Sequence, residues 1–274
     1  MMPSLSSIVR LVPGLVSTLT LAATLTGCPA VFPELQTRTR PIAPGLTLDP
    51  PPPEDVRFLR VASATVPDHT RDGRKWQASG KANPYAKVLV NEKELFKTPP
   101  QSDTLTPTWP NGPHGNFRIK PEDKMRVELW DSNTMNDVPI GLKELGRVSE
   151  LHPFEGKLRI ELDEGADMTL VIEPAHAVQG LGLWFELRTT GAGITRLLAG
   201  SPAERKGLVA GDDVLKIGDR DANAMSPDEL RSAFNAPPMD GLKLLIRHAQ
   251  GATTEITVKE GPIYPLFEQF GNLD

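Results

Sequence analysis

The chain has 274 residues, which is more than one ordinary domain needs, so its length predicts two domains. Its 30 lysine and arginine residues against 35 aspartate and glutamate residues give a formal net charge of −5, without a basic block that would follow a phosphate backbone. This balance argues against a nucleic-acid partner. The 27 prolines and 5% aromatic residues favour small β domains joined by coil over one large core.

Residues 1–27 have the pattern of a secretory signal peptide. Arg10 precedes an apolar run over residues 11–25 that is too short to span a bilayer. The run ends in Leu-Thr-Gly-Cys at residues 25–28, which resembles the lipobox of bacterial lipoproteins. The resemblance implies cleavage before Cys28, lipid attachment to that cysteine, and a place in the bacterial cell envelope.

Several acyl chains on Cys28 would hold the protein to a membrane far more firmly than a single chain does. Pro29 follows the cysteine where an aspartate would signal retention in the inner membrane, so we expect the outer membrane, facing the periplasm. The alternative is a free thiol beside an ordinary secretory cleavage site. Cys28 is the only cysteine, which excludes an intramolecular disulfide.

Residues 28–55 form the next segment, which is rich in proline and ends near the run Pro50 to Pro53. Such a sequence favours the extended polyproline conformation, a semi-rigid spacer of about 3 Å per residue. We therefore expect a tether behind the lipidated cysteine. The alternative is a ligand for a proline-recognition domain.

Residues 56–175 show the pattern of an antiparallel β-sandwich, with short strands and turn residues between them. In residues 124–129, Met125, Val127 and Leu129 face one way and the charged residues face the other. The strands expected here cover residues 56–64, 85–90, 94–98, 117–119, 124–129, 157–162 and 168–173. No amphipathic helix is expected in this region.

Four motifs in this region, in the expected order, resemble those of C2 domains, the β-sandwiches that bind calcium and phospholipid. They are Asn-Pro-Tyr-Ala-Lys-Val at residues 83–88, Thr-Pro-Thr-Trp at 106–109, the strand and loop 127–133, and Asp-Val-Pro-Ile-Gly at 137–141. The resemblance implies a C2-like fold over about 120 residues.

Calcium is the cofactor that this resemblance implies, and no other cofactor is expected. The calcium ligands it suggests are Asp131, Asn133, Asp137, Asp68, Asp72 and Asn83. Calcium takes six to eight oxygens, several of them charged, whereas two of these positions carry asparagine. The alternative is a structural sandwich with polar loops. The cationic loop 67–81 with Trp76 raises a further hypothesis, contact with an anionic membrane surface.

Residues 178–260 resemble the PDZ domains found beside bacterial periplasmic proteases. The motifs are Gly-Leu-Gly-Leu at residues 180–183, Gly-Ser-Pro-Ala-Glu at 200–204 with a glycine and leucine at 207–208, and Gly-Asp-Asp-Val-Leu at 211–215. A helix is expected to begin near Ser226, where serine can cap and the following proline suits the first turn. The fold class is thus mainly β, a C2-like antiparallel sandwich followed by a PDZ-like, partly open barrel with two short helices.

The resemblance to PDZ domains implies a groove for a peptide that adds to the sheet as an extra strand. Backbone N–H groups of the glycine-rich loop would hold a terminal carboxylate, and apolar side chains would line the pocket. The residues expected at this site are Gly180, Leu181, Gly182, Leu183, Phe185, Leu230 and Phe234. The alternative for Leu230 and Phe234 is a purely structural role in the core. Residues 261–274 form a C-terminal tail that either packs back on the fold or binds a partner.

No catalytic motif is evident. The five histidines lack the spacing of a zinc site, and no nucleophile elbow is present. We therefore expect no enzyme, but a lipid-anchored envelope scaffold whose PDZ-like groove captures a C-terminal or extended segment of an envelope protein. One alternative is a non-catalytic adaptor subunit of an envelope protease or secretion system. Another is a hydrolase with a dyad dispersed through the sandwich loops.

Overall fold

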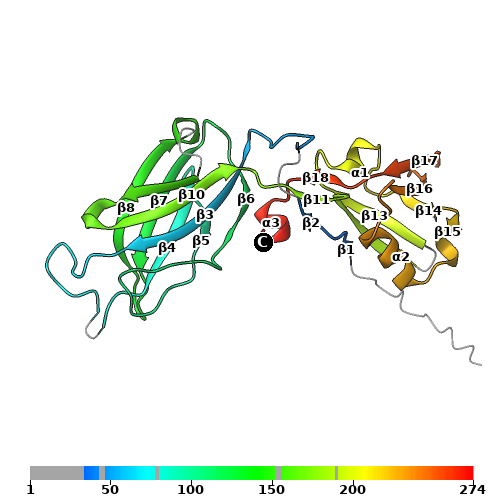
Figure 1. Ribbon diagram of the computed structural model, residues 1–274. Helices are drawn as coiled ribbons and strands as arrows, with labels where there is room; N and C mark the ends of the chain where they lie inside the picture. The colour runs from blue at the N-terminus through cyan, green and yellow to red at the C-terminus, as the bar shows by residue number, and fades with distance from the viewer. Residues whose placement is uncertain (1–33, 43–46, 78–79, 152–155, 189–190, 274) are drawn as a thin grey trace, which may run out of the picture. The chain divides into compact units, whose positions relative to one another are not determined.

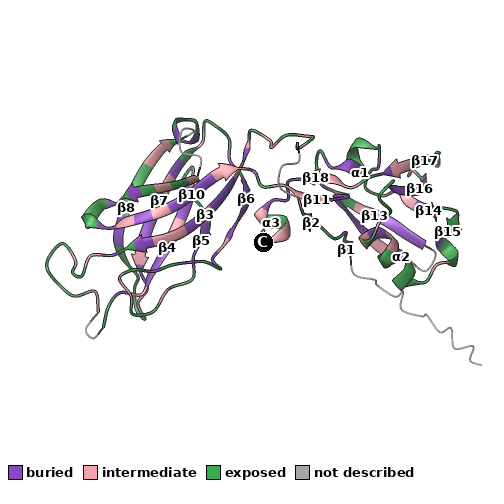
Figure 2. Cartoon of the chain, viewed as in Figure 1, coloured by how far each residue is buried: buried purple, intermediate pink, exposed green. Residues whose placement is uncertain are grey.

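The computed structural model describes residues 34–42, 47–77, 80–151, 156–188 and 191–273. The fold is mainly β and antiparallel, as the sequence predicts (Figure 1). No helix in these ranges is long and apolar enough to cross a membrane. Figure 2 shows that buried residues concentrate in the strands and exposed residues in the loops.

Two four-stranded sheets form a β-sandwich. The first has the order β6 (His114–Arg118), β3 (Val56–Thr65), β10 (Asp167–Pro174) and β9 (Gly156–Glu161). The second has the order β5 (Lys93–Lys97), β4 (Pro84–Val90), β7 (Lys124–Asp131) and β8 (Val138–Arg147). Two 3-10 turns, Val148–Leu151 and Asp163–Gly165, lie in the connections.

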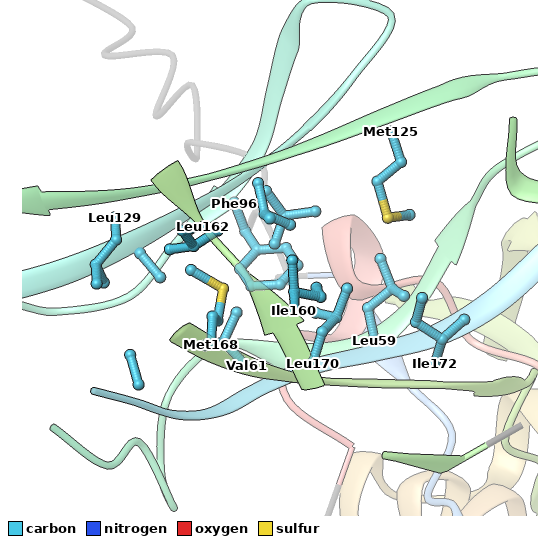
Figure 3. Packing of buried hydrophobic residues seen from close by; sticks show 14 of the residues in the cluster. Leu59, Val61, Phe96, Met125, Leu129, Ile160, Leu162, Met168, Leu170 and Ile172 are labelled. Carbon is cyan, nitrogen blue, oxygen red and sulfur yellow. The ribbon is translucent and has the colours of Figure 1, made fainter. Parts of the chain in front are cut away.

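The core of the sandwich is built from side chains of both sheets. Met125 and Leu129 of one sheet turn toward Leu59 and Leu170 of the other, and all four are fully buried (Figure 3). The predicted alternation of β7 is confirmed, because its apolar face enters this core. Burial of each such side chain contributes roughly 1.5–3 kcal/mol.

Strand β8 is the one strand among the described residues of the sandwich that the sequence pattern did not predict. Most of its residues are exposed, and register shifts interrupt its pairing with β7. A strand at the edge of a sheet needs no continuous apolar face, so the period-two signal is weak there. Four residues of the C2-like motif at 137–141 thus lie in the first part of this strand.

A seven-stranded antiparallel sheet forms the other half of the fold. Its order is β1 (Leu35–Gln36), β12 (Leu183–Arg188), β13 (Gly191–Leu197), β14 (Asp213–Ile217), β16 (Leu242–Arg247) and β17 (Thr253–Val258), with β15 (Arg220–Asp221) beside β14. The sheet carries the two expected short helices, α1 (Pro202–Arg205) and α2 (Pro227–Asn235), and a 3-10 turn at Ala222–Ala224.

Helix α2 begins where the sequence predicts. The Ser226 hydroxyl accepts a hydrogen bond from the Glu229 amide, and the Glu229 carboxylate accepts one from the Ser226 amide, which completes a capping box. These contacts, with the Ser226 amide bond first, lower the pKa of Glu229 to about 2. Leu230 and Phe234, four residues apart, place their buried side chains on the sheet side of the helix.

Part of the proline-rich segment, residues 34–41, is not an extended spacer but pairs with the folded part of the chain. Strand β1 joins the large sheet, and β2 (Arg40–Pro41) joins a small sheet of order β18 (Gly261–Ile263), β11 (Val178–Gly180), β2. Further along, the Tyr264 hydroxyl donates a hydrogen bond to the Pro50 carbonyl at 2.7 Å. Segments on either side of residues 43–46 are therefore bound to the folded part of the chain.

The C-terminal tail packs back on the fold, which was one of the two alternatives. Ile263, Tyr264 and Leu266 are buried, and the one-turn helix α3 (Phe267–Phe270) follows them. Phe267 packs on Phe117 of β6 with ring centroids 5.0 Å apart.

A buried asparagine of β6 fixes both the tail and the segment that follows the sandwich. Asn116 donates hydrogen bonds to the carbonyls of His176 and Pro265 and accepts one from the His176 amide. Its side chain thus holds two segments that lie 60 and 149 residues away in the chain.

Candidate functional site

The candidate groove lies between strand β12 and helix α2. Phe185 of β12 and Phe234 of α2 stack with ring centroids 4.3 Å apart, and Leu230 is buried in the same apolar cluster. Leu181 and Leu183 from the glycine-rich loop belong to this cluster as well. The sequence-predicted apolar residues of the site are therefore brought together, and each of them also forms part of the core.

The glycine-rich loop requires glycine at position 182. Gly182 has φ +72°, which L residues rarely adopt, and an added Cβ would come within 2.4 Å of the Ser201 Cβ. The Gly182 carbonyl accepts the Leu198 amide, and the Leu181 carbonyl accepts the Ala203 amide. The loop is therefore held tightly between the end of β13 and the start of α1.

The outer edge of β12 is occupied by the chain's own residues 34–38. Strand β1 pairs antiparallel with β12, with Leu35 opposite Phe185. The Thr37 amide and hydroxyl both donate to the Leu183 carbonyl, at 3.1 and 3.0 Å. Leu35 packs against the apolar cluster and Thr37 is buried, whereas the alternate residues Glu34 and Gln36 are exposed.

An ionic contact fixes the start of this segment on the opposite face of β12. The Glu34 carboxylate accepts two hydrogen bonds from the Arg196 guanidinium, at 3.0 and 2.5 Å. Arg196 in turn lies over the Trp184 ring, 4.6 Å from its centroid. The hydrogen bond from Arg196 is the main cause that lowers the pKa of Glu34.

The segment does not end at the glycine-rich loop but continues past it. The Arg38 amide donates to the Asn235 side chain at the end of α2, at 3.0 Å. Strand β2 then pairs with β11, and Arg40 forms an ion pair with Glu260. The groove thus holds an internal stretch of chain that runs toward the loop and beyond it.

The loop at the end of β7 brings together four of the six expected calcium ligands. Both oxygens of Asp131 accept hydrogen bonds, from the Asn83 amide at 2.6 Å and the Asn133 side chain at 3.0 Å. Both oxygens of Asp137 also accept, from the Asn133 amide at 3.0 Å and the Tyr85 hydroxyl at 2.8 Å. The Tyr85 hydrogen bond is the main cause that lowers the pKa of Asp137.

The other two expected calcium ligands have different partners. Asp68 pairs with His69 at 3.2 Å and Asp72 with Arg74 at 2.5 Å, and both carboxylates are exposed. Among the described residues, no three histidine, cysteine, aspartate or glutamate side chains gather closely enough to hold a metal ion. Two carboxylates are fewer charged ligands than calcium usually takes, and each of their oxygens already accepts a hydrogen bond. Calcium binding at this loop stays a prediction.

Models of two domain families match this chain. The C2 domain model covers residues 65–167 and the PDZ domain model covers residues 161–247. A C2 domain is followed by a PDZ domain. The sandwich is thus the C2 domain, and the groove between β12 and α2 belongs to the PDZ domain.

Solved structures similar to this chain include C2 domains of extended synaptotagmins. One, of extended synaptotagmin 2 with its SMP domain and two C2 domains, has 19% identity and a TM-score of 0.37; the match covers 50% of this chain and 28% of that one. A C2 domain of a plant extended synaptotagmin 1 has 19% identity and a TM-score of 0.35, with 44% and 96% covered. This chain thus spans little more than a quarter of the first of these proteins. No curated protein matches the sequence.

The sequence pattern did not predict three residues that hold the segment 34–38 on β12: Thr37, Arg196 and Asn235. The period-two pattern of residues 34–37, with leucine and threonine alternating with polar residues, was the available signal for a strand. The neighbouring prolines, Pro33 and Pro41, favoured the interpretation as a spacer instead. Arg196 lies 162 residues from Glu34, and Asn235 lies 197 residues from Arg38, whose amide it binds. No local sequence pattern could therefore have predicted these contacts.

Two further predicted features can be located. Trp76 of the loop 67–81 is half-buried against the C2 core, and its indole N–H donates to the Pro67 carbonyl, so this ring is part of the packing. Cys28, the predicted lipidation site, lies outside the described residues.

Proposed function

We propose that this chain is a lipid-anchored scaffold of the bacterial cell envelope whose PDZ domain captures extended peptide segments of a partner protein. The observation that carries the proposal is the added strand on β12. The two-residue strand β1 pairs there, its Leu35 side chain packs against the apolar cluster, and the amide of the next residue, Thr37, donates to the Leu183 carbonyl. The β12 edge can therefore recruit a peptide backbone, which is the mode called β-augmentation.

Affinity in this mode comes from main-chain hydrogen bonds, and selectivity comes from the pockets for alternate side chains. The β12 edge offers an apolar contact next to Phe185 on the groove face and a cation, Arg196, on the opposite face. A partner segment would thus carry an apolar residue next to an acidic one. C2 and PDZ domains are typically binding domains, which supports a scaffold without catalysis of its own.

The proposed anchor is Cys28, supported by the lipobox-like residues 25–28. A shared membrane surface would raise the effective concentration of an anchored partner and so compensate for a modest affinity. Metabolic labelling with an alkyne-bearing fatty acid tests the anchor: we expect a labelled protein that loses its label in the Cys28→Ser variant. Equal labelling of the two proteins would contradict it.

Peptide capture is tested by selection from a displayed library of random decapeptides, with free and with blocked C-termini. The bait is the full chain carrying Leu35→Asp, which weakens the hold of β1 on the groove. We expect related sequences to be enriched. N-methylation of an enriched peptide should weaken binding when the methyl group is at every second position and should have little effect at the positions between, because only every second amide faces β12. No enrichment, or an effect of N-methylation without alternation, would refute peptide capture by strand addition.

A further inference from the structure

The segment that fills the PDZ groove is bound to β12 over a shorter stretch than the strand on the other side of β12. Strand β1 has two paired residues, whereas β12 pairs with β13 over six residues. Of residues 34–38, only Thr37 is buried, and Leu35 is partly buried. Leu35 packs against the buried cluster of the PDZ domain but is not one of its buried members. Removal of this segment would therefore take no buried residue out of that cluster.

The direction of the segment is that of a bound peptide. It runs antiparallel to β12, so its chain approaches the glycine-rich loop from Leu35 to Thr37. Its alternate side chains divide between the two faces of β12, with Leu35 on the Phe185 side and Glu34 on the side of Trp184 and Arg196. Three of the four positions from Glu34 to Thr37 therefore have a specific contact, and only Gln36 has none of these contacts.

The segment is also internal to the chain, which sets the kind of ligand that the groove accepts. After Thr37 the backbone passes the loop, and the Arg38 amide binds Asn235 in place of a chain end. A terminal carboxylate is thus not required for a peptide to occupy the groove.

We propose that residues 34–38, Glu-Leu-Gln-Thr-Arg, are a displaceable internal ligand of the PDZ groove, and that partners compete for it with extended internal segments of the pattern acidic, apolar, any residue, threonine. This inference rests on the proposed function and specifies its ligand. Because the segment belongs to the same chain, it acts at an effective concentration of roughly 1 mM. If the free peptide binds with a dissociation constant of about 0.1 mM, the attached segment weakens competing peptides about tenfold.

The test uses a fluorescent peptide of residues 32–41 with blocked ends, and the full chain. Fluorescence anisotropy compares the wild type with a Leu35→Asp, Thr37→Pro double variant, which removes the apolar contact and the amide that binds Leu183. The matched control is Thr47→Pro, Leu48→Asp, the same changes outside the groove. We expect the groove variant to bind the peptide at least tenfold more tightly than the wild type or the control.

Two modified peptides test the register. In an antiparallel pair, bonded and non-bonded residues alternate, so the Thr37 amide faces β12 and the Gln36 amide points away. N-methylation at Thr37 should abolish binding to the groove variant, and N-methylation at Gln36 should leave it nearly unchanged. Equal binding of all proteins, or a folded groove variant that does not bind, would overturn the inference.

A second modified protein keeps the inference testable if the groove variant does not fold. A protease site inserted after the exposed Thr47 leaves every groove residue intact. After cleavage, an excess of unlabelled peptide should release the N-terminal fragment during gel filtration. Retention of the fragment would show that the segment is a fixed part of the fold and would overturn the inference. If other library peptides bind the opened groove while this peptide does not, only the internal ligand is refuted; if no peptide binds, the proposed function fails.

Discussion

Asn116 offers the sharpest test of how the C2 domain holds the tail and the segment leading to the PDZ domain. Its side chain is fully buried and makes three hydrogen bonds to backbone groups of His176 and Pro265. Asn116→Ala removes all three and leaves the backbone groups unpaired. At about 1 kcal/mol for each bond, we expect local stability to fall by about 3 kcal/mol.

The assay is amide hydrogen exchange at His176, whose N–H donates to the Asn116 oxygen at 2.7 Å. A loss of about 3 kcal/mol corresponds to roughly a hundredfold faster exchange if the amide exchanges by local opening. Asn116→Asp is a second variant, because it keeps the acceptor for this amide but turns a carboxylate oxygen toward the carbonyls of His176 and Pro265. We expect its His176 amide also to exchange faster than that of the wild type, because a buried carboxylate that faces two carbonyls is unfavourable. An acceleration of less than threefold in Asn116→Ala would refute the reasoning.

The described contacts lead to further expected outcomes. Phe234→Ala should destabilise the PDZ domain by about 3–5 kcal/mol in urea unfolding, because it empties a buried site stacked on Phe185; a cost below about 1 kcal/mol would contradict this packing. Ser226→Ala should cost about 1 kcal/mol through loss of the N-cap. The pKa of Glu229 is lowered from 4.5 to about 2, so this residue contributes stability above pH 4.5 that is lost as the pH falls toward about 2. Glu229→Gln should flatten this acid dependence of stability, and an unchanged profile would refute the reasoning. Calorimetric titration of calcium into the millimolar range should give no heat, because the oxygens of Asp131 are already engaged; heat that disappears in Asp131→Ala would show that the loop rearranges to bind calcium.

Much of the fold could be predicted because its signals are local. A few neighbouring residues are enough to predict β7 from its alternation. The same is true of the start of α2, which its serine, proline and glutamate predict. The glycine-rich loop is local too, since Gly182 needs a backbone conformation that other residues rarely adopt. These features gave the mainly β class and the position of the groove.

The contents of the groove could not be predicted, because they depend on contacts across most of the chain. Thr37 meets Leu183 at a separation of 146 residues. The start of β6 was missed for a related reason: His114, Gly115 and Asn116 show no apolar pattern, yet all three are buried. The tail and the segment after the sandwich supply the cover for these residues, so their burial is decided by distant parts of the chain.

Strand β11 has neighbours on both sides that lie far from it in the sequence, β2 at residues 40–41 and β18 at residues 261–263. A fragment cut at the limits of the matched PDZ segment, residues 161–247, would lack both of these strands as well as β1 and β17. Its sheets would expose newly unpaired edges, which invite pairing with other copies and nonspecific peptides. Binding measured on such a fragment would include pairing at these edges, so selectivity is better measured on the chain from residue 34 onward, which keeps β1, β2, β17 and β18.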